Sequence, residues 1–325
     1  MTMTKRKAEI PAPETIGVKR VPTTSLIPNP HNPRMLFDRA PLDVLKESIA
    51  KVGILVPLTV YWEVRKNSFV ILDGQRRWMC AQSLGLYDVP VNQIAEPTLV
   101  QNIVTMFQIH KFRADWELMP TALKLEVLMK ELGERNEKKL SALTGLDRAV
   151  VSRCKKLLTY SRRFQDLMLH RDPSERIKAD FFIELYPVVN DRLTTTLEWF
   201  AKEEFITRML TKYVARKGLK AVTDFRVMKQ CITNAHRAGK DKLIGRKLQE
   251  FTYNDALNLD HLSIQSATVY ATAKKLVSGI NKTEEAIRKM DPAQYYGEEE
   301  LWTSLERLLT QIRSKLEAAN RRLKE

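Results

Sequence analysis

The sequence has little cysteine and no long apolar run. Its 325 residues include three cysteines, Cys80, Cys154 and Cys231, which lie far apart and form no Cys-x-x-Cys pair. This usage argues against a disulfide framework or a structural zinc site. No uncharged stretch reaches the roughly 18 apolar residues of a membrane-spanning helix. Glu9 and its neighbouring prolines interrupt the apolar segment that a signal peptide requires. We therefore expect a cytoplasmic protein that does not associate with a membrane.

The chain is rich in basic residues instead. Lysine and arginine together number 54, against 39 aspartates and glutamates, and the formal net charge is +15. Such an excess favours a polyanionic partner, because cationic side chains that neutralise phosphates release condensed counterions. The charge alone does not separate DNA from RNA or anionic lipid.

Two patterns of apolar residues divide the chain. Up to about residue 96, short apolar runs at 55–61 and 68–72 alternate with an amphipathic pattern at 42–52, which indicates an α/β unit. Beyond residue 99 the apolar period is helical. Helix ends are predicted at Gly133, Gly145, Pro173, Gly218, Gly239, Gly245 and Asp291.

The turn from Asp73 to Arg77 joins a predicted strand to a predicted helix. A helix N-terminus presents free backbone N–H groups and a positive dipole end, both of which suit phosphate. Arg76 and Arg77 lie in the first helical turn, where cations oppose the dipole, and a bound anion would explain their presence. The alternative is that both arginines pair with carboxylates or face water.

Residues 138–157 have the pattern of a helix–turn–helix. A shared core is predicted from Leu140, Leu143, Leu146, Val151 and Leu157. Gly145 permits the tight turn, and Asp147 is placed to cap the second helix. The candidates for DNA contact are Lys138, Lys139, Arg148, Ala149, Ser152, Arg153, Lys155 and Lys156. Arg148, Ala149 and Ser152 are expected at base edges, and the lysines at phosphates. The alternative is a plain helical hairpin with solvated charges.

Four segments in order carry a resemblance to a known family. They are Asn29-Pro30-His31-Asn32-Pro33-Arg34, the stretch from Leu45 to Leu58 with Ser48, Gly53 and Pro57, the turn Asp73–Arg77, and Val89-Pro90-Val91. In this order and spacing they resemble the N-terminal domain of the ParB/RepB plasmid and chromosome partition proteins. The position of the helix–turn–helix just after this domain extends the resemblance to about residue 190.

The resemblance implies a sulfiredoxin-like domain that binds cytidine triphosphate (CTP). It places the nucleotide at Arg34, Ser48, Gly53, Pro57, Gly74, Gln75, Arg76, Arg77 and Arg113, with Gln75 standing where the family has a glutamate. The family's Glu-Asn-x-x-Arg motif supplies an acid for magnesium and hydrolysis. Here Arg113 fits that motif, but Ile109 and His110 supply no oxygen ligand. Magnesium binding and CTP hydrolysis stay open, with Asp115 or Glu117 as the acid if the alignment shifts.

The predicted fold class is α+β. The expected divisions are a flexible basic arm (1–20), a small ParB/sulfiredoxin-like domain (21–110), an all-α helix–turn–helix domain (111–190), a helical region of unknown role (191–290) and a C-terminal amphipathic helix (291–325). The basic residues scattered from 193 to 247, Lys212 among them, are interpreted as a solvated face or a second DNA-contacting surface. The apolar stripe from Leu301 to Leu323 either packs on its own domain or forms a dimerising coiled coil.

The resemblance implies a DNA-binding protein of plasmid or chromosome partition, acting as a CTP-switched clamp on double-stranded DNA. It further implies a homodimer, association with the nucleoid or a plasmid, and a ParA-type ATPase docked on the basic arm at Lys5, Arg6, Lys7, Lys19 and Arg20. A second hypothesis is a site-specific transcriptional regulator or mobile-element accessory factor without nucleotide switching. A third is a metal-dependent nuclease, for which Asp73 is the single candidate acid near the turn.

Overall fold

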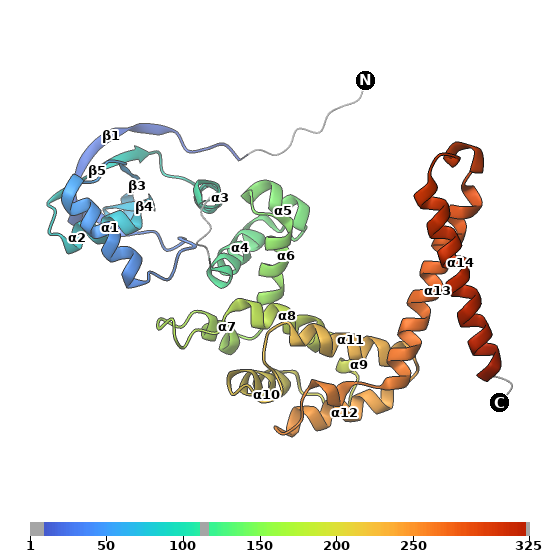
Figure 1. Cartoon of the computed structure of the whole chain (residues 1–325). Helices are drawn as coiled ribbons and strands as arrows, with labels where there is room; N and C mark the ends of the chain where they lie inside the picture. The colour runs from blue at the N-terminus through green and yellow to red at the C-terminus, as the bar shows by residue number, and fades with distance from the viewer. Residues whose placement is uncertain (1–9, 111–116, 323–325) are drawn as a thin grey trace. The chain divides into compact units, whose positions relative to one another are not determined.

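The computed structural model describes residues 10–110 and 117–322. The chain forms two compact units, one containing the residues up to 229 together with 249–261, and the other containing 230–248 and 262–325. The first unit has a five-stranded sheet followed by helices, and the second is built of helices (Figure 1). The α+β fold class predicted from the sequence is confirmed.

The sheet combines parallel and antiparallel pairs. Its strands are β1 (Thr15–Pro22), β2 (Leu26–Pro28), β3 (Leu58–Glu63), β4 (Ser68–Asp73) and β5 (Asp88–Ile94), in the spatial order β1-β5-β3-β4-β2. The pairs β1–β5 and β3–β4 are antiparallel, whereas β3–β5 and β2–β4 are parallel. Strands β3 and β4 therefore have a partner on each side, which fixes the position of the turn that follows β4.

Helices cover both faces of this sheet. They are α2 (Gln75–Ser83) and α3 (Leu99–His110), and α1 (Arg39–Val52) packs against α2. Ala81 of α2 lies in one buried cluster with Val60 and Ile71, and Met106 of α3 lies in a second cluster with Val70. Neighbouring residues of one strand enter different clusters, because successive side chains of a strand point to opposite faces. The continuous apolar runs in the sequence are thus explained by burial on both sides.

The helical region begins after residue 116. Its α-helices are α4 (Leu118–Leu132), α5 (Glu137–Thr144), α6 (Arg148–Leu157), α7 (Arg162–Met168), α8 (Ala179–Val189), α9 (Arg192–Thr195), α10 (Lys202–Val214), α11 (Asp224–Arg237), α12 (Asp241–Tyr253), α13 (Gln265–Lys289) and α14 (Glu299–Arg322). Short 3₁₀ turns are η1 (Thr23–Ser25), η2 (Val64–Lys66), η3 (Leu259–Leu262) and η4 (Pro292–Tyr295). Helix α6 packs against α4, α5 and α8.

The last residues of the predicted flexible arm form a strand. Residues 15–20 belong to strand β1, whose pairing with β5 brings Lys19 opposite Val91 and Arg20 opposite Pro90. Arg20 forms an ion pair of 2.6 Å with Asp88. The composition of this segment is typical of a flexible arm. Its pairing with a strand about 70 residues later in the chain outweighs that local preference. Lys5, Arg6 and Lys7 lie outside the described residues.

Two predicted local signals in the helices are wrong. Gly245 does not end a helix but lies inside α12, where Ile244 and Leu248 are buried. Their burial outweighs the cost of about 1 kcal/mol for an internal glycine. Asp147 stands at the N-cap of α6 but makes no side-chain capping bond, whereas Asn136 caps α5 through the amides of residues 138 and 139.

Cys80, Cys154 and Cys231 are all free thiols. Within the part of the chain that the structure describes, each helix is too short or too polar to cross a membrane. In the same residues, no group of three or more His, Cys, Asp or Glu side chains is placed to hold a metal ion.

Candidate functional site

The turn after β4 is built around Gly74. This residue is the N-cap of α2 and has a φ of 95°, a left-handed conformation that side chains with a Cβ adopt at a cost. A Cβ on Gly74 would also lie 2.9 Å from Cγ of Leu58 and 3.0 Å from Nη2 of Arg77. No side chain caps α2. The turn therefore leaves the amides of the first helical turn facing the space in front of the helix.

Arg77 holds this turn from within the protein. Its side chain is 16% exposed and forms an ion pair of 2.8 Å with Asp73, which is 14% exposed. The Arg77 guanidinium also donates to the carbonyl oxygens of Val56 and Pro57, the latter at 3.0 Å. Arg77 thus joins the end of β4 to the segment that leads into β3. The alternative that this arginine pairs with a carboxylate is correct. A phosphate ligand would have to share the Arg77 guanidinium with Asp73.

Two asparagines shape the loop that faces the turn. Oδ1 of Asn29 accepts from the amide of His31, and Oδ1 of Asn32 accepts from the amide of Arg34, both at 2.9 Å. Each asparagine thereby makes a local turn of the kind that this residue type favours before proline. Nδ2 of Asn29 donates to buried Asn102 of α3, and Nδ2 of Asn32 donates to Oε1 of Gln75 at 2.7 Å. These bonds place Arg34 beside the N-terminus of α2.

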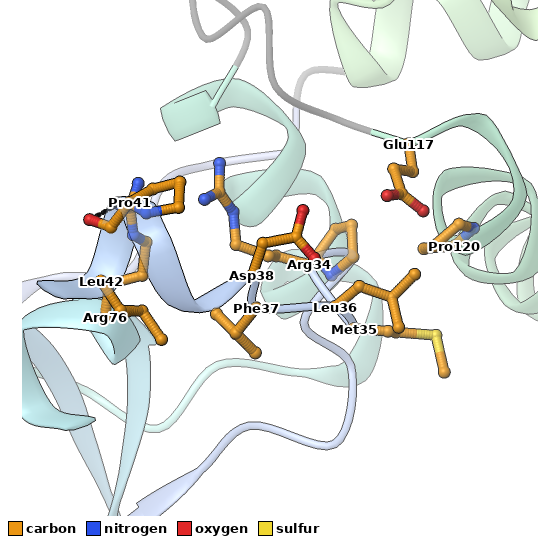
Figure 2. A pocket seen from close by; sticks show the side chains of 11 residues that line it. Arg34, Met35, Leu36, Phe37, Asp38, Pro41, Leu42, Arg76, Glu117 and Pro120 are labelled. Carbon is orange, nitrogen blue, oxygen red and sulfur yellow. Dashed lines mark hydrogen bonds between the residues drawn. The ribbon is translucent and has the colours of Figure 1, made fainter. Parts of the chain in front are cut away.

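Two cavities meet at this loop and share Arg34, Phe37 and Arg76 in their lining. The inner cavity, of about 240 Å³, lies over the turn and is also lined by Gly74, Gln75 and Arg77. The outer cavity, of about 220 Å³, extends toward α1 and α4 (Figure 2). Ligand pockets in proteins are typically about 300–1,000 Å³, so the two spaces together are suited to one elongated ligand.

Arg76 contacts the protein backbone at this place. Its Nη2 donates to the carbonyl oxygen of Pro41 at 2.8 Å, the bond drawn as a dashed line in Figure 2. A guanidinium has five N–H donors, so most of its donor capacity remains for a ligand. Arg76 and Arg34 supply positive charge to both cavities at the end of a helix that itself favours anions.

The outer cavity is also lined by acidic side chains. Asp38 precedes α1 and Glu117 precedes α4, and both line the cavity. Arg176 is 12% exposed; it forms an ion pair with Glu117 and lies 3.6 Å from Asp38. Burial raises the pKa of Glu117, and the charge of Arg176 opposes that shift. The wall of the cavity is therefore made jointly by the loop, α1 and the start of α4.

The outer face of the helix–turn–helix is exposed where the sequence places base contacts. Arg148 has a side chain 72% exposed and lies 3.7 Å from Glu137. Lys138, Lys139 and Ala149 are exposed as well. Buried Leu140, Val151 and Leu157 belong to the core, as predicted. This arrangement of α5, α6 and their exposed basic residues is suited to a DNA groove.

Three of the remaining candidates on α6, namely Arg153, Lys155 and Lys156, contact other parts of the protein. Arg153 forms an ion pair with Asp180 at the start of α8. Nζ of Lys155 donates to the carbonyl oxygen of Arg135 at 3.1 Å, and Lys156 lies 5.6 Å from the centre of the Tyr186 ring. Ser152 is half-buried. These side chains connect α6 to its neighbours, and their contact with DNA remains a prediction.

Comparison with known proteins agrees with this geometry. Residues 7–106 match the family model of the ParB N-terminal domain. This part of the chain is similar to a ParB N-terminal domain. The chain is 27% identical over 166 residues to a nucleoid occlusion protein of Geobacillus sp. (strain WCH70), with 49% of this chain and 56% of that protein covered.

Two further relatives are partition and sporulation proteins. The chromosome-partitioning protein ParB of Caulobacter vibrioides (strain NA1000 / CB15N) is 28% identical over 170 residues, covering 50% of this chain and 53% of the relative. Stage 0 sporulation protein J of Bacillus subtilis (strain 168) is 31% identical over 153 residues, covering 46% and 52%. The chain thus spans about half the length of the curated relatives that it matches.

Solved structures of ParB from Caulobacter crescentus are also similar. A C-terminally truncated form complexed with CTP-γ-S is 26% identical, with a TM-score of 0.29, covering 52% of this chain and 92% of that one. A form complexed to the centromeric parS site is 20% identical, with a TM-score of 0.40, covering 65% and 98%.

The structure brings together some of the predicted nucleotide residues. Arg34, Gly74, Gln75, Arg76 and Arg77 line the inner cavity. Pro57 is connected to them through its carbonyl oxygen, which accepts from Arg77. The described lining of the two cavities includes neither Ser48, which is exposed on α1, nor Gly53, which follows that helix. Arg113 and Asp115 lie outside the described residues.

Other residues that the sequence does not assign to the site also line these cavities. Phe37, Asp38 and Leu45 are in this group. Asn32 was noted in the motif but not assigned to the site, although the repeated Asn-Pro pairs were a signal for two side-chain-stabilised turns. Glu117, considered only as a substitute acid, lines the outer cavity.

Proposed function

We propose that this chain is a ParB-type partition protein that binds a specific DNA site and changes its grip on DNA when CTP binds the N-terminal domain. The helix–turn–helix of α5 and α6 would read the DNA, and the two joined cavities would hold the nucleotide. Arg34, Arg76 and the N-terminus of α2 would contact the triphosphate, while Arg77 would keep the turn in shape. A ParA-type ATPase partner is part of this proposal.

The observation that carries the proposal is the shared lining of the outer cavity. Glu117 and Pro120, at the start of α4, line the same space as Arg34 and Arg76. Helix α4 packs against α6, the second helix of the helix–turn–helix. A ligand in this space would contact an element that supports the DNA-reading helix. It could then favour one arrangement of the two parts by binding that arrangement more tightly.

A second contact supports the same connection. Nζ of Lys124, on α4, donates to the carbonyl oxygen of Pro30 at 2.8 Å. Pro30 lies in the loop that presents Arg34, so a movement of this loop would displace its hydrogen-bond partner on α4. Arg176, which contacts Glu117, lies just before α8, and α8 also packs against α6. The loop, α4 and α8 thus form a continuous set of contacts between the cavity and α6.

The proposed nucleotide site is tested by substitution of Arg76. We expect Arg76→Ala to weaken CTP binding about 30- to 150-fold, because one charge-assisted contact contributes roughly 2–3 kcal/mol. Calorimetric titration with each of the four ribonucleoside triphosphates measures the effect and the base preference. Arg65→Ala, at an exposed arginine of η2, is the matched control. Binding of none of the four by the unmodified chain would favour the transcriptional regulator, and unchanged affinity of Arg76→Ala would exclude this site.

The proposed DNA surface is tested by substitution of Arg148. We expect Arg148→Ala to weaken binding to the preferred duplex by about 1–3 kcal/mol and to relax base preference at one position. The preferred duplex is first selected from a randomised library, and affinities are then compared by fluorescence anisotropy. Arg162→Ala serves as the control, because the Arg162 side chain on α7 is 67% exposed and pairs with Asp166. Equal binding by Arg148→Ala and the unmodified chain would remove α6 from the DNA interface.

A further inference from the structure

The side-chain amide of Gln75 is oriented by a chain of hydrogen bonds that starts at a backbone N–H. The amide nitrogen of Arg34 donates to Oδ1 of Asn32 at 2.9 Å. A backbone N–H can only donate, so the Asn32 side chain must turn its oxygen to Arg34 and its nitrogen away. That nitrogen, Nδ2, donates to Oε1 of Gln75 at 2.7 Å. The oxygen of Gln75 is therefore engaged, and its nitrogen, Nε2, lies on the branch of the amide that faces away from Asn32.

Gln75 holds this orientation in the wall of the inner cavity. It is the first residue of α2, is half-buried, and lines the cavity beside Arg34 and Arg76. Among the described residues, Nε2 of Gln75 has no hydrogen-bond partner. Its two N–H groups thus add to the donors of the arginines and of the uncapped helix N-terminus.

The carboxylates in the described lining of the two cavities each have an arginine beside them. In the inner cavity, Asp73 lies 2.8 Å from Nη2 of Arg77. In the outer cavity, Asp38 and Glu117 share Arg176 (Figure 2). Magnesium takes oxygen ligands, and to reach these carboxylates it would have to displace a guanidinium at each place. The described lining is therefore poorly suited to a divalent cation and well suited to an anion.

We propose that Gln75 donates through Nε2 to a phosphate oxygen of the bound nucleotide, and that the two cavities hold the triphosphate without a divalent cation. Hydrogen bonds to a charged acceptor are roughly twice as strong as neutral ones. Asn32 is a positioning residue, because it keeps the oxygen of Gln75 away from the phosphates. The proposal rests on the nucleotide site proposed above, and it specifies the ligand as the free triphosphate rather than its magnesium complex.

The first test measures how binding depends on magnesium. The full chain is titrated by calorimetry with each of the four ribonucleoside triphosphates and with inorganic triphosphate, in EDTA and in magnesium. Binding should be at least as tight in EDTA, and a loss of more than about tenfold there overturns the proposal. Inorganic triphosphate that binds in EDTA without any preference for CTP among the nucleotides would contradict the nucleotide proposed above but support the phosphate site. Binding of none of these probes overturns both.

The second test reverses the donor of Gln75. Gln75→Glu keeps the size of the side chain and the bond from Asn32, but it turns a carboxylate oxygen toward the phosphates. We expect triphosphate binding in EDTA to weaken at least about 30-fold, through a lost donor and an added repulsion. Magnesium should recover at least about fivefold of this loss, because a cation can bridge the two anions. Unchanged affinity of Gln75→Glu overturns the proposal.

Two controls accompany this variant. An acid in the first turn of α2 favours the helix dipole, so circular dichroism of Gln75→Glu should show no loss of helix. Gln82→Glu adds the same charge at an exposed position of the same helix, and it should bind triphosphate like the unmodified chain. An equal loss of affinity in Gln82→Glu would show that net charge, and not the donor of Gln75, is responsible, and it would overturn the proposal.

The third test asks whether Asn32 acts through Gln75. Asn32→Asp still accepts from the amide of Arg34 but offers no donor, so Gln75 must turn its nitrogen to the new carboxylate and its oxygen to the phosphates. The loss of triphosphate affinity should be at least about fivefold larger in the unmodified chain than in a Gln75→Ala background, because only Gln75 transmits this reversal. Equal losses in the two backgrounds overturn the positioning role of Asn32.

Discussion

Replacing Lys212 by alanine is expected to lower the free energy of unfolding by about 3 kcal/mol, because a long buried side chain and a charged hydrogen bond are lost together. The Lys212 side chain on α10 is 1% exposed. Its Nζ donates to the carbonyl oxygen of Asn254 at 2.8 Å and lies 3.4 Å from Oδ1 of Asp255. It also lies 4.8 Å from the centre of the Phe251 ring. One ammonium therefore joins α10 to the end of α12.

Lys217 provides a matched control for this result. It pairs with the same Asp255 at 3.1 Å, but its side chain is 55% exposed. Lys217→Ala should therefore cost less than about 1 kcal/mol, as exposed ion pairs usually do. Unfolding in urea, followed by tryptophan fluorescence, to which Trp199 next to Phe205 and Tyr253 contributes, measures both variants. Equal losses of stability for the two lysines would show that burial of Lys212 is not the source of its effect.

Arg77→Ala is expected to lower the free energy of unfolding by about 3 kcal/mol, because it leaves the shielded carboxylate of Asp73 without its cation. It also removes the donor to the carbonyl oxygens of Val56 and Pro57. Arg76→Ala, one position earlier, removes a single bond to the carbonyl oxygen of Pro41 and should cost only about 1 kcal/mol. Thermal unfolding monitored by circular dichroism measures the difference. The two neighbouring arginines thus have different expected roles, Arg77 in stability and Arg76 in binding.

A double-mutant cycle with Asp73→Ala tests the reason for the Arg77 effect. If the ion pair is responsible, the double variant should be more stable than the sum of the single losses predicts, by about 1–3 kcal/mol. Arg77→Lys should recover only part of the stability, since an ammonium lacks the fork that reaches a carboxylate and two carbonyls at once. Simple additivity of the two single losses would contradict this account.

The sequence predicted the local features of the site because these depend on near neighbours. The strand at 68–72, the turn at Gly74 and the following helix all appear where the apolar period and the glycine place them. Arg76 was assigned to this turn for the same reason. The pairing of Arg77 with a carboxylate was one of the two alternatives. Its bonds to the carbonyl oxygens of Val56 and Pro57 were not predicted, because these lie about 20 residues earlier in the chain and come near only when β3 and β4 pair.

Burial of charged residues was the least predictable feature. Lys212 was interpreted as part of a solvated or DNA-contacting surface, because a lysine surrounded by other basic residues usually faces water. Its partner Asn254 is 42 residues away in sequence. Glu117 likewise joins the outer cavity because α4 starts beside the loop at 33–38. Such contacts follow from packing between distant elements, and no local pattern in the sequence marks them.

The shared lining of the outer cavity has a thermodynamic consequence. Helix α4 lines the outer cavity and also packs against α6. The affinity for a ligand that contacts the Arg34 loop and the start of α4 is therefore linked to the affinity for a ligand that depends on the orientation of α6. Linkage of this kind is reciprocal, so the factor by which one ligand changes the affinity for the other is the same in both directions. DNA would therefore act as an effector of the nucleotide site to the same extent that the nucleotide acts on DNA.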